Sequence, residues 1–277
     1  MPRTIHVGHS PDSDDAFMFY ALAEGLIETG DLAYQHELQD IETLNRRALA
    51  GELEVTAVSI HAYAYLTDRY ALLPSGSSMG DRYGPRLVSR TPLSLQEAAG
   101  KRIAVPGLLT TAYLALKLAV PRFEAVVMPF DRIEEAVHSG EAELGLLIHE
   151  GQLTFGDTGL HLIADLGEWW FTKTGLPLPL GGNVVRKDLG DALMRTISRH
   201  LRASIDYALD HRTGALDHAM KYARGLDRAM ADTFVGMYVN DWTRDYGERG
   251  RTAVRVLLQH GVDAGIISHP VTVEFVN

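Results

Sequence analysis

The sequence predicts an α/β fold made of two lobes that face each other across a ligand cleft. The chain has 277 residues and a hydrophobic content of 46%, which is enough for two lobes that each bury a core. A strand, a short loop and the start of a helix follow one another near the N-terminus and again near residue 102. This order is typical of parallel α/β sheets.

The first unit begins with a short strand and a polar loop. Its predicted elements are a strand at 4–7, a loop at 8–15, a helix at 16–24, a helix at 40–50 and a buried strand within 51–61. In the second of these helices, Asp40 is placed as the N-cap residue and Gly51 as the residue that ends the helix. Apolar residues recur along it at helical spacing.

The second unit repeats this order. Its predicted elements are a strand at 102–105, a loop at 106–109, a helix at 110–118, a helix at 132–139 that Gly140 ends, and a buried strand at 144–148. The segments GELEVTAVSIH (51–61) and GEAELGLLIH (140–149) share a G-E-x-E start and an apolar run. The match favours two lobes of like topology, and chance similarity of generic α/β pieces is the alternative. Duplication places Ser59 and His61 at one strand end and His149 at the other.

Two segments read as crossovers between the lobes, at 83–90 and 176–186. We therefore expect lobe one to contain residues 1–88 and 184–277, and lobe two residues 89–183. A long amphipathic helix is predicted at 188–209, with two or three helices after it. The tail at 271–276 reads as a strand or an ordered extension that packs on lobe one.

Composition excludes several classes of function. A net charge of −10 argues against nucleic acid or an anionic membrane as the main partner. Without cysteine, disulfides, Cys-ligated zinc and thiol catalysis are excluded. No apolar run is long enough for a membrane span, and the first residues lack the pattern of a signal peptide. We therefore expect a cytoplasmic protein. No pattern predicts an oligomeric state.

Three groups of residues are candidates for chemistry. Ser10, Asp12, Asp14 and Asp15 crowd the loop before the first helix, where they would cap that helix or bind ligand hydroxyls or a cation. Metal binding is the weaker choice because the EF-hand pattern is absent.

Thr110 and Thr111 open a helix behind a glycine turn, which suits either capping or a carboxylate or phosphate group. His149 ends a buried strand, where α/β folds bind ligands, and suits a general base or a structural role. The twelve histidines are scattered without a metal-binding motif, so no metal is expected. Trp169 and Trp170 would face opposite sides of a strand, so that at most one lines the cleft.

Several stretches together carry a family resemblance. They are SPDSDDAFMFYAL (10–22), DIETLNRRAL (40–49), SIHAYAYLTDRY (59–70), AVPGLLTTAY (104–113), GLLIHE (145–150), DLGEWW (165–170) and TGLPLPLGG (174–182). On these, the chain resembles the 1,4-dihydroxy-6-naphthoate synthase family of the futalosine route to menaquinone. The resemblance implies a two-lobed, periplasmic solute-binding-protein-like fold of type II.

The resemblance also implies a lyase that converts cyclic dehypoxanthinylfutalosine to 1,4-dihydroxy-6-naphthoate without a cofactor. His149 then stands where the family has its general base. Substrate-binding positions fall on Ser10, Asp14, Asp15, Asn45, Ser59, Thr110 and Thr111. The partner is a small carboxylated metabolite, and the lobes are expected to close on it.

The first loop departs from the family pattern S-P-C-P-N-D, because Asp12, Ser13 and Asp14 replace Cys, Pro and Asn. His61 likewise stands where a small residue is expected. The extra acids would disfavour a second ligand carboxylate and favour a hydroxyl-rich ligand. Two alternatives remain: a non-catalytic solute-binding protein, and a related small-acid lyase such as chorismate dehydratase.

Overall fold

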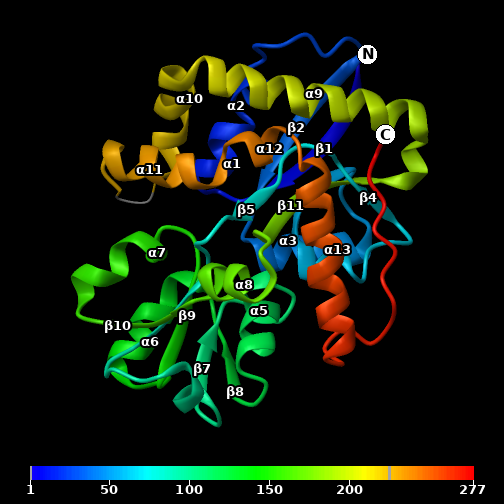
Figure 1. Ribbon diagram of the computed structural model, residues 1–277. Coiled ribbons are helices and arrows are strands. Elements are labelled where there is room, and N and C mark those ends of the chain that lie inside the picture. Colours follow the sequence, from blue (N-terminus) through cyan, green and yellow to red (C-terminus); the bar gives the residue numbers. More distant parts are fainter. Residues whose placement is uncertain (1, 224–225) are drawn as a thin grey trace.

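The computed structural model describes residues 2–223 and 226–277. It confirms an α/β fold with two sheets, one above the other, each with helices around it (Figure 1). In the first sheet, the strands run in the order β2 (Leu32–Leu38), β1 (Arg3–His9), β3 (Val55–Ser59), β11 (Leu178–Arg186), β4 (Tyr70–Leu72), with β5 (Ser78–Gly80) also on β11. In the second, the order is β10 (His161–Asp165), β6 (Arg86–Ser89), β9 (Leu144–Leu147), β7 (Arg102–Val105), β8 (Glu124–Val127).

The two sheets share one topology, which supports the duplication read from the sequence. In the first, β1 lies parallel to both β2 and β3, and β11 lies antiparallel beside β3. In the second, β7 lies parallel to both β8 and β9, and β6 lies antiparallel beside β9. The carboxyl ends of equivalent parallel strands are where such sheets bind ligands.

The helices surround both sheets. They are α1 (Ser13–Met18), α2 (Tyr20–Ala23), α3 (Ile41–Ala50), α4 (Ile60–Tyr63), α5 (Thr111–Ala119), α6 (Ile133–Ser139), α7 (Gly151–Thr154), α8 (Leu166–Thr174), α9 (Asp191–Asp210), α10 (Arg212–Ala219), α11 (Arg228–Tyr238), α12 (Asp241–Arg244) and α13 (Gly247–Asp263). The 3₁₀ turns η1 (Leu95–Ala98), η2 (Phe130–Arg132), η3 (Phe155–Thr158), η4 (Lys187–Leu189) and η5 (Met220–Tyr222) join them. None of the helices in the described ranges is long and apolar enough to cross a membrane.

Local sequence signals explain why several elements begin and end where they do. The Asp40 side chain accepts a hydrogen bond from the Thr43 backbone N–H at 3.0 Å, as an N-cap should. Gly51, with φ 74°, ends the same helix in the left-handed conformation. Gly8 in β1 has no room for a side chain, because a Cβ atom there would lie 2.5 Å from Leu53.

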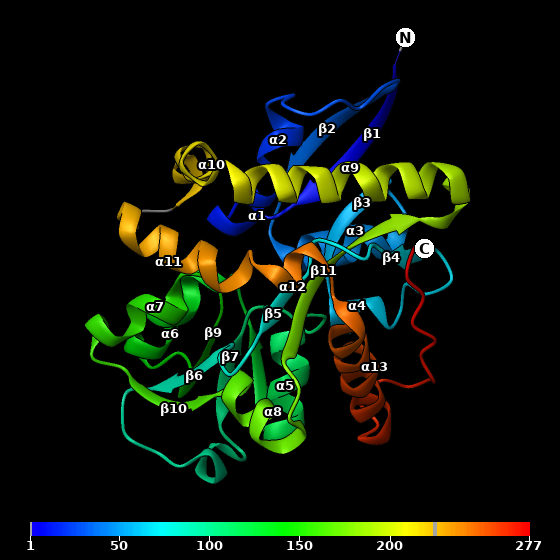
Figure 2. The ribbon, with the colours of Figure 1, turned by 45° about the horizontal axis from the view of Figure 1, so that its top comes forward.

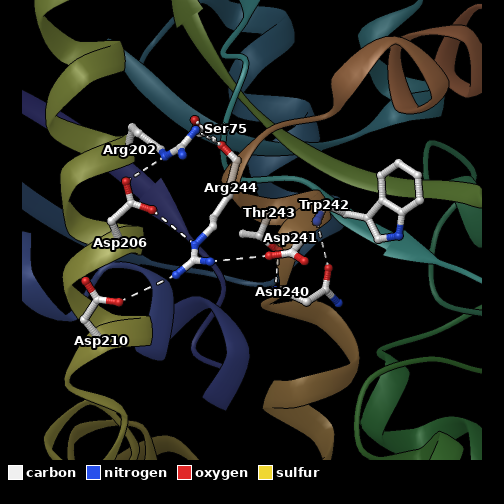
Figure 3. Close-up of polar contacts among 9 residues, drawn as sticks. All are labelled: Ser75, Arg202, Asp206, Asp210, Asn240, Asp241, Trp242, Thr243 and Arg244. Atoms are coloured by element: carbon white, nitrogen blue, oxygen red, sulfur yellow. Dashed lines mark hydrogen bonds and ion pairs between the residues drawn. The ribbon is translucent and has the colours of Figure 1, made fainter.

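One apolar core lies beneath α9, and a network of ion pairs joins that helix to α12. Leu201 and Ile205 of α9 pack into a buried cluster with residues of α1, α10 and α11. On the outer side, Asp206 lies 2.7 Å from Arg202 and 3.2 Å from Arg244 (Figure 3). The C-terminal region is thereby fixed over the first sheet.

Some sequence predictions need correction. The helix expected at 16–24 is broken at Phe19 into α1 and α2. The crossover at 176–186 is the strand β11, which pairs with three strands of the first sheet. The two tryptophans lie on a helix, α8, and not on a strand. The tail, by contrast, is the ordered extension that was one of its two expected forms, and it packs on the first sheet through a bridge between Phe275 and Leu72 of β4.

The chain passes from the first sheet to the second between β5 and β6, and it returns to the first sheet at β11. The division into lobes at residues 88 and 183 stays a proposal.

Candidate active site

A cavity of about 120 Å³ lies between the two sheets. Its walls come from the ends of equivalent strands, since the loops after β1 and β7, the last residues of β3 and the residues after β9 all reach it. The polar side chains of its wall are Ser10, Asp12, Asp14, Asp15, Ser59, Ser78, Thr110, Thr111, His149, Gln152, Asn183 and Tyr238. The structure therefore brings together all the predicted site residues except Asn45.

His149 stands two residues after the end of β9, where the chain turns into α7. Its φ of 54° lies in the left-handed region, which costs a residue with a side chain about 1 kcal/mol. The imidazole Nδ1 lies 2.9 Å from Oδ2 of Asp12, and its ring packs edge-on to Phe130 with centroids 4.8 Å apart. The Nε2 atom is buried and has no hydrogen-bond partner among the described residues.

The carboxylates around His149 govern its protonation. Burial alone would lower the pKa of His149, but the charge and hydrogen bond of Asp12, with smaller contributions from Glu150 and Asp14, outweigh it and raise the pKa to about 9. The histidine is therefore an imidazolium paired with Asp12 at neutral pH when the cavity is empty of substrate.

The first loop is built around carboxylates that do not cap the helix. Asp12 occupies the N-cap position of α1, yet its side chain makes no capping hydrogen bond; instead it accepts one from the Ser10 hydroxyl. Asp15 accepts the Ser10 backbone N–H at 2.7 Å. Burial, reinforced by neighbouring carboxylates, raises the pKa of Asp14 well above its usual range and that of Asp15 to about 7. Protonated carboxyl groups here can donate hydrogen bonds to a ligand.

Thr110 and Thr111 reach the cavity at the start of α5, but their hydroxyls are engaged within the protein. Thr110 caps the helix by accepting the Tyr113 N–H at 3.2 Å. The Thr111 hydroxyl donates to the carbonyl oxygen of Leu180 at 2.6 Å and accepts the His61 N–H at 3.1 Å. What this turn offers a ligand is therefore its backbone N–H groups and the positive end of the helix dipole.

Asn45 and Ser59 form a reciprocal pair. The Asn45 amide donates to the Ser59 hydroxyl at 3.1 Å, and its oxygen accepts the Ser59 N–H at 2.9 Å. Asn45 is fully buried on α3 and lies behind Ser59 rather than in the cavity wall. In this structure its contribution is to hold Ser59 at the strand end.

Sequence reasoning missed the residues that α7 and α11 contribute. The Tyr238 hydroxyl and the Gln152 amide lie 2.7 Å apart, and Phe234 lines the same cavity. Figure 2 shows α11 above α7, at the boundary between the two sheets. No local pattern indicates that α11 reaches a site whose other lining residues lie between positions 10 and 183. Asp12 was noticed in the loop but not assigned to His149.

Three of the ionisable side chains that line the cavity are carboxylates, Asp12, Asp14 and Asp15. Among the described residues, none that lines it is a lysine or arginine, and no group of three or more His, Asp or Glu has the arrangement of a metal site. A ligand carboxylate would therefore be held by backbone N–H groups.

Comparison with known proteins connects this site to a biosynthetic family. The profile of a family described by the words menaquinone biosynthesis matches residues 5–263. A 1,4-dihydroxy-6-naphthoate synthase of Thermus thermophilus is 43% identical over 95% of this chain and 96% of its own. The enzyme with the same name from Streptomyces coelicolor is 38% identical, with 95% of each chain covered.

Solved structures agree on the fold. A protein from Archaeoglobus fulgidus is 50% identical, with a TM-score of 0.91 over 95% of this chain and 98% of its own. The alkanesulfonate-binding protein of Xanthomonas axonopodis has a TM-score of 0.74 at 11% identity, over 98% of this chain and 96% of its own. The second likeness shows the periplasmic solute-binding-protein-like fold and nothing further.

Proposed function

Because the chain belongs to the menaquinone biosynthesis family, we propose that it is a carbon–carbon lyase that forms 1,4-dihydroxy-6-naphthoate from cyclic dehypoxanthinylfutalosine. Its partner is then a small carboxylated metabolite. The relatives that carry the naphthoate synthase name match this chain nearly end to end. The cytoplasmic location expected from the sequence stays a prediction.

The observation that carries the proposal is the placement of His149. The residue lines the cavity between the two lobes, and its Nε2 is buried without a hydrogen-bond partner among the described residues. A general base must lie within hydrogen-bond reach of the proton it removes, and a residue of the cavity wall can meet that condition. In the proposed reaction His149 removes a proton from the substrate, and formation of an aromatic ring favours the cleavage that follows.

Other residues around the cavity are suited to bind different parts of the substrate. The backbone N–H groups at the start of α5 are suited to the benzoate carboxylate, since no lysine or arginine of the described residues lines the cavity. Asp14, Asp15 and Ser59 are suited to the hydroxyl groups of the sugar-derived ring. The acidic first loop supports a substrate that presents hydroxyls, and not a second carboxylate, to this lobe.

The test is turnover of purified, metal-free protein with cyclic dehypoxanthinylfutalosine, with the naphthoate followed by chromatography. His149→Ala should lower kcat by a factor of about 10²–10⁴, while calorimetry still detects substrate binding. His138→Gln, which removes an exposed histidine from α6, is the matched control and should keep wild-type turnover.

Full activity in the His149→Ala variant would show that another group is the base. A wild-type protein that binds the substrate without converting it would overturn the reaction proposed here. In that case, loss of water from chorismate would be the next assay.

A further inference from the structure

Asp12 makes a contact that its position in the helix does not require. An aspartate at an N-cap normally accepts a backbone N–H of the first turn, and Asp12 does not. It is fully buried, and its Oδ2 atom lies 2.9 Å from Nδ1 of His149. The Ser10 hydroxyl donates to that same oxygen, which fixes the carboxylate in place.

This contact decides which nitrogen of His149 meets a ligand. A carboxylate accepts hydrogen bonds, so Nδ1 must carry a proton toward Asp12. Nε2, which has no partner among the described residues, is then left for the cavity. Phe130 packs against the ring and limits its rotation.

The two partners come from different sheets. Asp12 belongs to the loop after β1 of the first sheet, and His149 follows β9 of the second. Any opening of the cleft that moves one sheet from the other would therefore separate them. The pair forms only when the two sheets stand as close as they do in this structure.

We propose that Asp12 is a positioning residue for His149: it reaches across the cleft, holds the imidazole with Nε2 toward the substrate, and stabilises the imidazolium that forms on proton transfer. The inference rests on the proposed function, in which His149 is the base. In that step a substrate C–H bond breaks, its proton passes to Nε2 and its electron pair stays on the substrate. A carboxylate behind a catalytic imidazole is a known way to fix its tautomer and charge.

The charged groups that face His149 are Asp12, Asp14, Asp15 and Glu150, and the Asp12 carboxylate lies within ion-pair distance of the imidazole. Asp12→Asn keeps the shape of the side chain and removes its charge. The expected result is a fall of about 2 in the pKa of His149, followed by NMR of protein with isotope-labelled histidine. In the same variant kcat should fall about 10²-fold or more, with little change in KM, when both proteins are assayed at about pH 10, where His149 is largely neutral in each.

Asp131→Asn, which removes an exposed carboxylate beside Phe130, is the matched control and should alter neither quantity. An unchanged His149 pKa in Asp12→Asn, or a lowered pKa with unchanged turnover, would overturn the proposal. If the variant fails to fold, titration of the wild type decides: a His149 that titrates at its ordinary value, near 6.5, contradicts the pair. A wild type that binds no substrate would overturn the proposed function instead, and the titration would still test the pair.

Discussion

Two histidines occupy equivalent places in the two sheets and meet different partners. His61 stands two residues after β3, and His149 stands two residues after β9. Each reaches the loop that follows the first strand of the opposite unit. Nδ1 of His149 lies 2.9 Å from the Asp12 carboxylate after β1, whereas Nδ1 of His61 lies 3.3 Å from the Thr110 carbonyl oxygen after β7.

The partner, and not the topology, sets the chemistry of each ring. Burial lowers the pKa of His61 to about 4, since a neutral carbonyl only partly offsets it. Burial acts on His149 as well, but the Asp12 carboxylate reverses its effect. A duplicated fold thus supplies two matched positions, and one carboxylate makes one of them a candidate for proton transfer.

The largest effect expected from this difference is in the pH dependence of turnover. The base must be neutral to act, and the pKa of His149 is raised to about 9. We expect kcat/KM, which reports the free enzyme, to rise about 50-fold between pH 7 and pH 9. Initial rates at low substrate concentration across this range test it.

A profile that is flat above pH 7 would mean that the ion pair does not govern the base. In Asp12→Asn the rise should move to lower pH. The pH profiles of the wild type and Asp12→Asn, measured at the same substrate concentration, distinguish this shift from a loss of activity at every pH.

A smaller effect is expected on stability at acid pH from His61. Its pKa in the folded protein, about 4, lies below the unfolded value of 6.5. The stability that comes from burying it neutral is thus present above pH 6.5 and lost as pH falls toward 4. His61→Gln should reduce the loss between pH 7 and pH 4 by about 1–3 kcal/mol, measured by urea unfolding.

His138→Gln, which makes the same exchange at an exposed histidine, should leave the pH dependence of the free energy of unfolding equal to that of the wild type. Equal acid sensitivity in His61→Gln and wild type would contradict the account of a buried, neutral ring.

The smallest effect is expected in the exposed ion-pair network of α9 and α12. Asp210 lies 3.7 Å from Arg244 with its side chain 70% exposed, and Arg244 keeps Asp206 and Asp241 as partners (Figure 3). Asp210→Asn should change the free energy of unfolding by less than about 0.5 kcal/mol. A loss above 2 kcal/mol in urea unfolding would show that this network is as sensitive as a buried pair.

Local sequence patterns predicted the helices and strands better than the tertiary contacts between them. Asp40 and Gly51 bound α3 as expected, because capping depends on a few neighbouring residues. The contact between Asp12 and His149 joins residues more than a hundred positions apart, and no spacing rule reveals it. His149 itself was found because it ends a buried strand, and the family resemblance then gave it a role.

Other misses share this cause. Nothing in the sequence near Tyr238 indicates that α11 reaches the cavity, since an amphipathic pattern shows a buried face but not what covers it. Asn45 was expected to contact the ligand, but it lies behind Ser59 and donates a hydrogen bond to that hydroxyl. The sequence does not distinguish a residue that lines the cavity from one that holds a lining residue in place. Phe19 breaks the predicted first helix, although its neighbours are good helix formers.

The position of β11 in the sequence determines the order in which the two sheets can form during translation. All strands of the second sheet lie between Arg86 and Asp165 and are complete before β11 is made. The first sheet begins earlier but lacks β11, which joins β3 to β4 and β5, until residue 186, and its outer strand β4 meets the tail only at Phe275. The lobe that carries His149 can therefore fold during synthesis, while the lobe that carries Asp12 must wait for most of the chain.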